Sequence, residues 1–323
     1  MSHIISYNRH IGLLFLLIFT TFFSIGCSSE KSISLGKESL QKPTSAHQTL
    51  RDNTPEILIP EAPGETVFQS DTVILDVSNT SSGYVVLTYS GENEKVKFQI
   101  VAPDSITYTY LVTNYGKPMV FPLTGQNGTY LFSLLESVGS DKDLYAILLS
   151  QEIEVSVNNE FLPYLTPNIY ANFDSASTAV AKGEELAKEC FSDLDVIENI
   201  YYYVTQCIVY DDEKAQSVTY GYLPDPDNTL SSGKGICFDY ASLMTTMLRS
   251  QRIPTKLEVG YAGEVYHAWI SCYVNEIGWV DNIIEFDGNS WSLMDPTLAA
   301  NNKRSAVAQY IGDGSNYIVK YTY

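Results

Sequence analysis

The hydrophobic pattern of the chain changes its period about halfway along. Over residues 57–157, short β-branched and aromatic runs alternate apolar with polar positions, as half-buried strands do. In SITYTYLV, Ile106, Tyr108, Tyr110 and Val112 share one face. The other runs are TVILDVS, YVVLTYS, KVKFQIVA, TYLFSLL, LYAILLS and EIEVSV, and turn signals such as QNG separate them. Six or seven short strands of this kind predict a small β-sandwich over residues 57–157.

After residue 174 the apolar period becomes helical. The run SASTAVAKGEELAKEC predicts one helix, and DLDVIENIYYYVTQC predicts a second, capped by Ser192 or Asp193. The apolar face of the second helix is expected to comprise Leu194, Ile197, Tyr201 and Val204. The segment 161–173, which precedes both helices, contains two prolines and several aromatic residues, so we expect a fixed joint rather than a loose linker.

A third helix is predicted to begin at Cys237. Its apolar positions recur at intervals of four, three and four residues, at Cys237, Ala241, Met244 and Leu248. Three predicted strands follow, TKLEVGYAG, YHAWISCYV and SWSLMDPT. The second half of the chain, residues 158–323, is therefore expected to combine helices with a sheet in one domain.

The first 27 residues have the pattern of a secretory signal. Arg9 and His10 precede the apolar run IGLLFLLIFTTFFSIGC, which is short for a membrane span. The end of this run, Ser24-Ile25-Gly26-Cys27, resembles a bacterial lipobox, in which the cysteine becomes the lipidated first residue. Ser24 departs from that motif, which usually has Leu or Val at this position. We expect a lipid on Cys27 that anchors the protein to the outer face of the cell membrane, with residues 28–56 as a flexible tether. The alternatives are plain secretion and an uncleaved anchor.

The net charge and the cysteine content limit which partners and which disulfides the chain can have. The chain has 323 residues and a formal net charge of -19, which argues against binding to a nucleic-acid backbone. Of the five cysteines, Cys27 is expected to carry a lipid and Cys237 to be a free thiol. The other three can therefore form at most one disulfide. Cys190 and Cys207 are the nearest pair; the alternative is that Cys190, Cys207 and Cys272 are all reduced and buried.

The thiol of Cys237 is the first candidate for chemistry. Free amide groups and the positive end of the helix dipole lie in the first turn of a helix, and both favour the nucleophilic thiolate. Gly233 and Gly235 in GKGIC allow a sharp turn and the close approach of a substrate. The alternative is a small cysteine packed in the core.

The residues downstream favour catalysis. His267 stands near the start of a predicted strand, and Asp295 ends the next. The other three histidines lie in the signal or the tether, so only His267 is left as a base for the folded part. In a triad, His267 takes the thiol proton of Cys237 and Asp295 orients the imidazole.

The motifs GKGICFDYASL, HAWISCYV and WSLMDPT, in this order, resemble the transglutaminase-like superfamily, also called transglutaminase/protease-like. The resemblance covers roughly residues 160–300 and includes the lead-in Tyr210-Asp211. It implies an α+β, papain-like fold in which a helix carries the nucleophile and packs on an antiparallel sheet that carries the other two residues. By this resemblance Cys237 is the nucleophile, His267 the general base and acid, and Asp295 the orienting acid.

Other site residues are less specific. The resemblance makes Tyr222 a candidate for the second oxyanion donor, and the alternative is an ordinary loop tyrosine. Trp269 is expected in the core. The acidic residues near the site are expected to be solvated, so neither a metal nor another cofactor is predicted; they are Asp211, Asp212, Glu213, Asp225 and Asp227.

The resemblance implies acyl transfer from a carboxamide through a thioester on Cys237. Hydrolysis of peptide or amide bonds is favoured over transamidation, and the expected substrates are peptides, surface proteins or cell-wall peptides. The alternative is an inactive surface scaffold with the same fold. A substrate-binding lipoprotein is disfavoured because the repeated strand–helix pattern of two α/β lobes is missing from the sequence. Residues 211–232 are the expected lid over Cys237.

Overall fold

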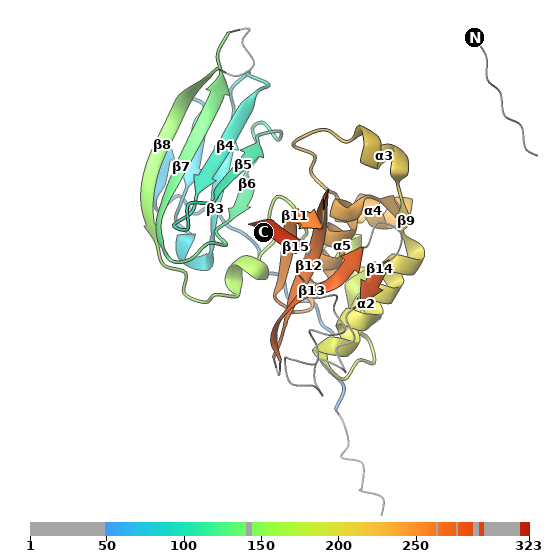
Figure 1. Ribbon diagram of the computed structural model, residues 1–323. Helices are drawn as coiled ribbons and strands as arrows, with labels where there is room; N and C mark the ends of the chain where they lie inside the picture. Colours follow the sequence, from blue (N-terminus) through green and yellow to red (C-terminus); the bar gives the residue numbers. More distant parts are fainter. Residues whose placement is uncertain (1–48, 140–143, 263, 276, 287–290, 294–316) are drawn as a thin grey trace, which may run out of the picture. The chain divides into compact units, whose positions relative to one another are not determined.

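The computed structural model describes residues 49–323 except 140–143, 263, 276, 287–290 and 294–316. Residues 47–323 form one compact unit, and Figure 1 shows its elements. The expected signal, the lipidation site Cys27 and most of the expected tether lie outside the described residues, as does Asp295. None of the described helices is long and apolar enough to cross a membrane.

Two four-stranded antiparallel sheets make up the first part, as the sequence pattern predicts (Figure 1). One sheet has the order β1-β2-β3-β6, with β1 (Val67–Gln69), β2 (Val73–Asp76), β3 (Tyr84–Tyr89) and β6 (Met119–Pro122). The other has the order β5-β4-β7-β8, with β4 (Val96–Val101), β5 (Thr107–Leu111), β7 (Gly128–Ser137) and β8 (Tyr145–Val155). A short 3₁₀ turn (Thr80–Ser82) precedes β3.

Aromatic rings join the two sheets into a sandwich. Phe121 of β6 contacts Phe98 of β4 and Tyr110 of β5, with ring centroids 4.8 and 4.7 Å apart. Phe98, Tyr110 and Phe121 are all buried, because alternate residues of each strand face the other sheet. The two last predicted runs, LYAILLS and EIEVSV, form the single long strand β8.

The joint after the sandwich is packed rather than loose. It contains a 3₁₀ turn (Leu162–Tyr164), and both Thr166 and Asn168 are buried. The Ser242 hydroxyl donates to the carbonyl of Tyr170 at 2.5 Å, which fixes the joint to the helix that follows Cys237.

The described residues of the second part form five helices and a five-stranded sheet. The helices are α1 (Thr178–Ala187), α2 (Asp193–Cys207), α3 (Asp212–Ser217), α4 (Pro226–Ser232) and α5 (Cys237–Ser250). The sheet is antiparallel with the order β14-β13-β12-β11-β15, from β11 (Thr255–Ala262), β12 (Val265–Val274), β13 (Gly278–Phe286), β14 (Trp291–Leu293) and β15 (Tyr317–Thr322). Two strands of two residues each, β9 (Val209–Tyr210) after α2 and β10 (Lys234–Gly235) before α5, pair in parallel. The α+β fold with a helix on an antiparallel sheet agrees with the prediction.

Helix α5 is buried along most of its length and packs against β11 and β12. Near its end, the buried Arg249 donates to the carbonyl groups of Thr166, Thr255 and Tyr323 at 2.8, 2.8 and 2.9 Å. Burial lowers the pKa of the Arg249 guanidinium to about 9. Arg249 thus connects the joint, α5, β11 and the end of the sheet.

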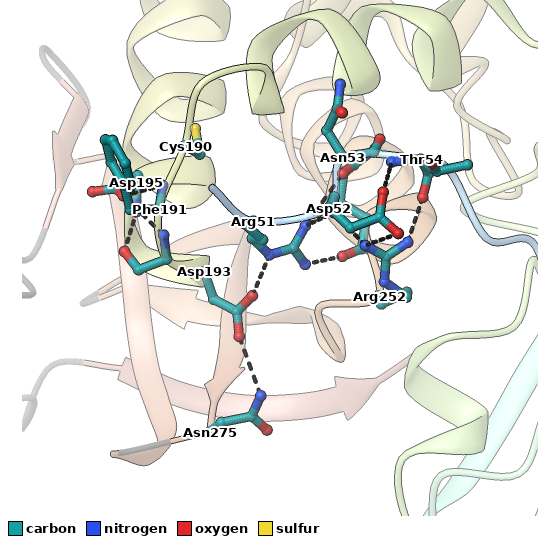
Figure 2. Close-up of polar contacts among 12 residues, drawn as sticks. Arg51, Asp52, Asn53, Thr54, Cys190, Phe191, Asp193, Asp195, Arg252 and Asn275 are labelled. Carbon is teal, nitrogen blue, oxygen red and sulfur yellow. Dashed lines mark hydrogen bonds and ion pairs between the residues drawn. The ribbon is translucent and has the colours of Figure 1, made fainter. Parts of the chain in front are cut away.

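The last residues of the expected tether do not behave as a tether. Arg51 to Glu56 lie along the ends of α1, α2 and α5 (Figure 2). The Arg51 guanidinium contacts Asp193 at 2.7 Å and the backbone carbonyl of Gln251, and its amide donates to the carbonyl of Cys190 at 2.8 Å. We call residues 51–56 the strap. A polar composition suggested flexibility, but the polar groups are hydrogen-bonded to the core.

The described cysteines, Cys190, Cys207, Cys237 and Cys272, are all free thiols in the structure. Cys190 accepts a contact from the Asn199 amide at 3.2 Å. Cys272 is buried beside Thr255. The nearest-pair disulfide is therefore not formed.

Candidate active site

Cys237 is the first residue of α5, as the sequence predicts. Helix α4 ends at Gly233, whose φ of +64° lies in the left-handed region that favours glycine. The chain then pairs β10 with β9 in a register that sets Gly235 opposite Tyr210. This short ladder fixes the start of α5 beside Tyr210.

A buried carboxylate holds the start of α5. Asp239 is fully buried, and its Oδ2 accepts the backbone N–H of Ile236 at 2.8 Å. A Cβ at Gly235 would lie 2.6 Å from the Cβ of Asp239, so this position has no room for a side chain. The second glycine of GKGIC is therefore required for the packing of Asp239.

His267 lies on β12 and opens onto the same cavity as Cys237. It pairs with Gly260 of β11 and is only 5% exposed. The next residue, Ala268, donates its backbone N–H to the Cys237 thiol, as does Phe238. The structure thus brings together two of the three predicted triad residues, whereas Asp295 lies outside the described residues.

Burial dominates the protonation of both groups. It raises the pKa of the Cys237 thiol above its ordinary value, and the amides of Ala268 and Phe238 oppose that rise only in part. Burial also lowers the pKa of His267 to about 4. At neutral pH both groups are uncharged, which differs from the thiolate expected from the helix dipole alone. An uncharged imidazole is the form that accepts a proton.

Tyr222 lines the cavity, but its hydroxyl is engaged elsewhere. It donates to Asp239 Oδ1 at 2.6 Å and accepts from Lys214 Nζ at 2.5 Å, while Lys214 also contacts Asp239 at 2.6 Å. Burial and the Asp239 carboxylate raise the pKa of Tyr222. In this arrangement Tyr222 serves the start of α5 rather than a developing oxyanion.

Tyr210 is a site residue that sequence reasoning noted only as part of the lead-in. Its hydroxyl accepts the backbone N–H of Cys237 and lies close enough to the thiol to interact with it electrostatically. Burial raises the pKa of Tyr210, so its hydroxyl keeps its proton at neutral pH. The two-residue pairing of β9 with β10 brings it there, and no periodicity in the sequence signals such a short ladder.

The acidic residues of the connecting segments cap helices. Asp211 and Asp225 accept the amides of Lys214 and Asn228 at the starts of α3 and α4. Asp227 accepts the amide of Ala179 at 2.8 Å. Trp269 is buried, as expected, and donates to the buried Glu258 at 3.0 Å.

Comparisons with known proteins give one match to a family model and several distant matches to solved structures. Residues 181–296 match the sequence model of the transglutaminase-like superfamily, whereas no curated protein matches the chain. Among solved structures, a candidate cysteine protease from Cytophaga hutchinsonii is 13% identical with a TM-score of 0.36, and the alignment covers 80% of this chain and 73% of that protein. A candidate protease from Parabacteroides distasonis is 11% identical (TM-score 0.27; 63% and 61% covered). Red sea bream transglutaminase is 13% identical (TM-score 0.27; 68% and 48% covered).

The chain therefore spans 48–73% of the length of these three proteins. The family likeness rests on the sequence match, which includes both Cys237 and His267. Over residues 181–296, this chain is similar to the transglutaminase-like superfamily.

Proposed function

We propose that the chain is a cysteine-dependent enzyme that cleaves or transfers peptide or carboxamide bonds through a thioester on Cys237. The observation that carries the proposal is the opening of Cys237 and His267 onto one cavity, with the amide beside His267 bonded to the thiol. A buried structural cysteine has no need of a neighbouring base, whereas a nucleophilic thiol does.

The proposed reaction begins with proton transfer from the Cys237 thiol to the uncharged His267. The sulfur attacks the carbonyl carbon, and the negative charge moves to the carbonyl oxygen. The hydroxyl of Tyr210, which accepts the backbone N–H of Cys237, is proposed to donate its proton to that oxygen. His267 then returns the proton to the departing amine, which leaves a thioester on Cys237.

Water completes hydrolysis, and a primary amine completes transamidation. We propose hydrolysis as the main reaction, on peptides, surface proteins or cell-wall peptides. Asp295 remains the proposed orienting acid, because the sequence motif DPT supports it. A surface scaffold with the same fold is the competing function, and the test below separates the two.

The test follows peptide release and amine incorporation on a mixed peptide substrate, with and without an added primary amine. Cys237→Ser and His267→Ala are expected to abolish both products. Tyr210→Phe is expected to lower kcat by about 10²-fold with little change in KM, as loss of one oxyanion donor does. Cys207→Ser is the matched control, because Cys207 is an exposed free thiol that is not among the residues lining the cavity. Product formation that survives Cys237→Ser would refute the proposal.

We also propose that Cys27 carries a lipid that anchors the protein on the extracytoplasmic face of the cell membrane. The support is the sequence of the N-terminal segment, a charged start, an apolar run and the Gly26-Cys27 end. Cys27→Ser is expected to release the protein from the membrane fraction. Retention of an unprocessed and unlipidated wild-type chain would contradict the lipid anchor.

A further inference from the structure

The cavity at Cys237 has an unusual lining. Its volume is about 470 Å³, which suits a substrate side chain with its adjoining backbone. Among the described residues, no Asp, Glu, Lys or Arg side chain lines it. Tyrosine predominates, and Tyr170, Tyr266 and Tyr323 are examples. The walls therefore offer aromatic faces and hydroxyl groups but no fixed charge.

One wall of the cavity comes from the sandwich. Strand β5 contributes Tyr110 and Leu111, although this strand is more than 120 residues before Cys237 in the chain. Tyr110 contacts Tyr170 and Tyr323, with ring centroids 5.8 and 6.1 Å apart. The sandwich is thus packed directly against the aromatic floor of the cavity.

A second part of the lining is the segment between α3 and α4, which is held onto β5. The hydroxyl of Tyr220 donates to the carbonyl of Thr109 at 3.1 Å. Gly221 has a φ of +86°, and a Cβ there would lie 2.4 Å from Leu111 Cδ1. The close fit of Gly221 on Leu111 keeps this wall in a defined position relative to Cys237.

Aromatic rings also lie at the solvent-exposed opening (the mouth) of the cavity. Tyr220 is 68% exposed and Tyr266, beside His267, is 55% exposed, although both line the cavity. Lys214, which contacts the lining residue Tyr222, is already bound to Asp239 at 2.6 Å. A charged side chain that entered would lose its water without gaining a partner, whereas an aromatic ring would gain burial and ring contacts.

We propose that this cavity binds an aromatic side chain of the substrate, on the residue that carries the carbonyl attacked by Cys237, and that β5 of the sandwich is a specificity wall. The inference rests on the proposed function, since it names the substrate of the same thiol. It gives the sandwich a direct part in substrate selection.

The test uses four tripeptide chloromethyl ketones that differ only in the side chain next to the reactive group: Phe, Ala, Lys or Asp. The Cys237 sulfur forms a bond to the methylene carbon, chloride leaves, and the thiol proton passes to His267. Labelling of Cys237 in the purified full chain is quantified by mass spectrometry. The Phe probe is expected to react at least about tenfold faster than the Ala probe, with Lys and Asp no faster than Ala.

Two variants locate the preference. Tyr220→Ala at the mouth and Leu111→Ala on β5 are each expected to lower the Phe-to-Ala rate ratio by about threefold or more. Tyr202→Ala is the matched control, because Tyr202 is an exposed tyrosine of α2 that does not line the cavity. Tyr220 is mostly exposed, so its variant is expected to fold.

Equal rates for Phe and Ala, a fastest rate for Lys, or a ratio unchanged in both variants would each overturn the inference. Such results with turnover still dependent on Cys237 would leave the proposed function standing. Turnover that does not depend on Cys237 would instead remove the proposed function, whatever the probe ratio. The two failures are therefore distinguishable.

Discussion

At the scale of single residues, the protonation of Cys237 and His267 decides how the proposed reaction would start. Both groups lose water on burial, so each is uncharged near neutral pH. This pair differs from the preformed thiolate–imidazolium pair of many cysteine enzymes. A neutral pair requires the substrate carbonyl to be in place before proton transfer becomes favourable.

The pH dependence of alkylation tests this protonation. The pKa of Cys237 is raised, so its thiolate forms at higher pH in the folded chain than in the unfolded chain. The rate of alkylation by iodoacetamide is therefore expected to rise at higher pH in the folded chain. His267 has a pKa of about 4, so it carries no charge between pH 5 and 8 and its replacement by alanine is expected to leave the profile unchanged there. The measurement compares Cys237 labelling in folded wild type, folded His267→Ala and urea-unfolded wild type.

The opposite result would be fast labelling at pH 5–6 that disappears in His267→Ala. That outcome would show a thiolate–imidazolium pair in the resting enzyme and would contradict the neutral assignment. Slow labelling of the folded chain together with normal labelling in urea supports it.

The sequence predicted those site residues that lie within a recognisable local motif. Cys237 and His267 lie in GKGIC and HAW, and the structure places both at one cavity. Tyr222 was a candidate for the second oxyanion donor, with an ordinary loop tyrosine as the alternative; its hydroxyl binds Asp239, a partner that only the folded loop brings near. The contact of Tyr210 with the Cys237 amide was not predicted, for the same reason.

At the scale of elements, the start of α5 depends on a cluster of three side chains. Lys214 comes from α3, Tyr222 from the following loop, and Asp239 from α5 itself. The expected lid, residues 211–232, contains α3 and α4 and is attached to α5 through this cluster. Opening of the segment therefore requires these contacts to break.

Asp239→Ala removes the acceptor of this cluster. It leaves the Lys214 cation and the Ile236 amide without their partner, and the expected loss in free energy of unfolding is about 3 kcal/mol. Urea unfolding measures the loss, and limited proteolysis is expected to cut residues 212–223 faster. Glu213→Ala on α3 is the control and is expected to change stability by less than about 0.5 kcal/mol. Equal stability of the Asp239 and Glu213 variants would refute a structural role for the cluster.

The elements that were predicted well have strong local signals. Helix α2 matches residues 193–207 because Ser192 and Asp195 form a reciprocal capping box. Strands β1 and β6 are only three and four residues long, which is too short for a clear period. Strand β13, GWVDNIIEF, was missed because its apolar residues do not alternate regularly.

At the scale of the whole described molecule, residues 47–323 act as one compact unit, although the sequence pattern divides at about residue 157. Contacts explain this: the Thr124 hydroxyl donates to the carbonyl of Thr322 at 2.6 Å, and Tyr108 contacts Tyr321 with ring centroids 5.5 Å apart. Such long-range pairings were not predictable from periodicity, because it reports only on neighbours along the chain.

The strap also stabilises the compact unit, and Arg51→Ala is expected to weaken its attachment to α2 and α5. The Arg51 side chain is only 13% exposed and binds both Asp193 and Gln251, so its loss is expected to lower the free energy of unfolding by about 1–2 kcal/mol. Chemical unfolding measures the change, with Lys182→Ala as control, because Lys182 forms a more exposed pair with Glu185. A loss no larger than that of the control would mean that the strap rests on the core without stabilising it.

The strap also sets an order of events during synthesis. Its partners Glu184, Asp193 and Gln251 follow it by 131 to 200 residues, so none of them exists when the strap leaves the ribosome. The sandwich, in contrast, is contained within a continuous stretch and has its own buried face. The strap is therefore made before the sandwich but is among the last described segments to be fixed in place, because it is anchored only when the core around Cys237 is complete.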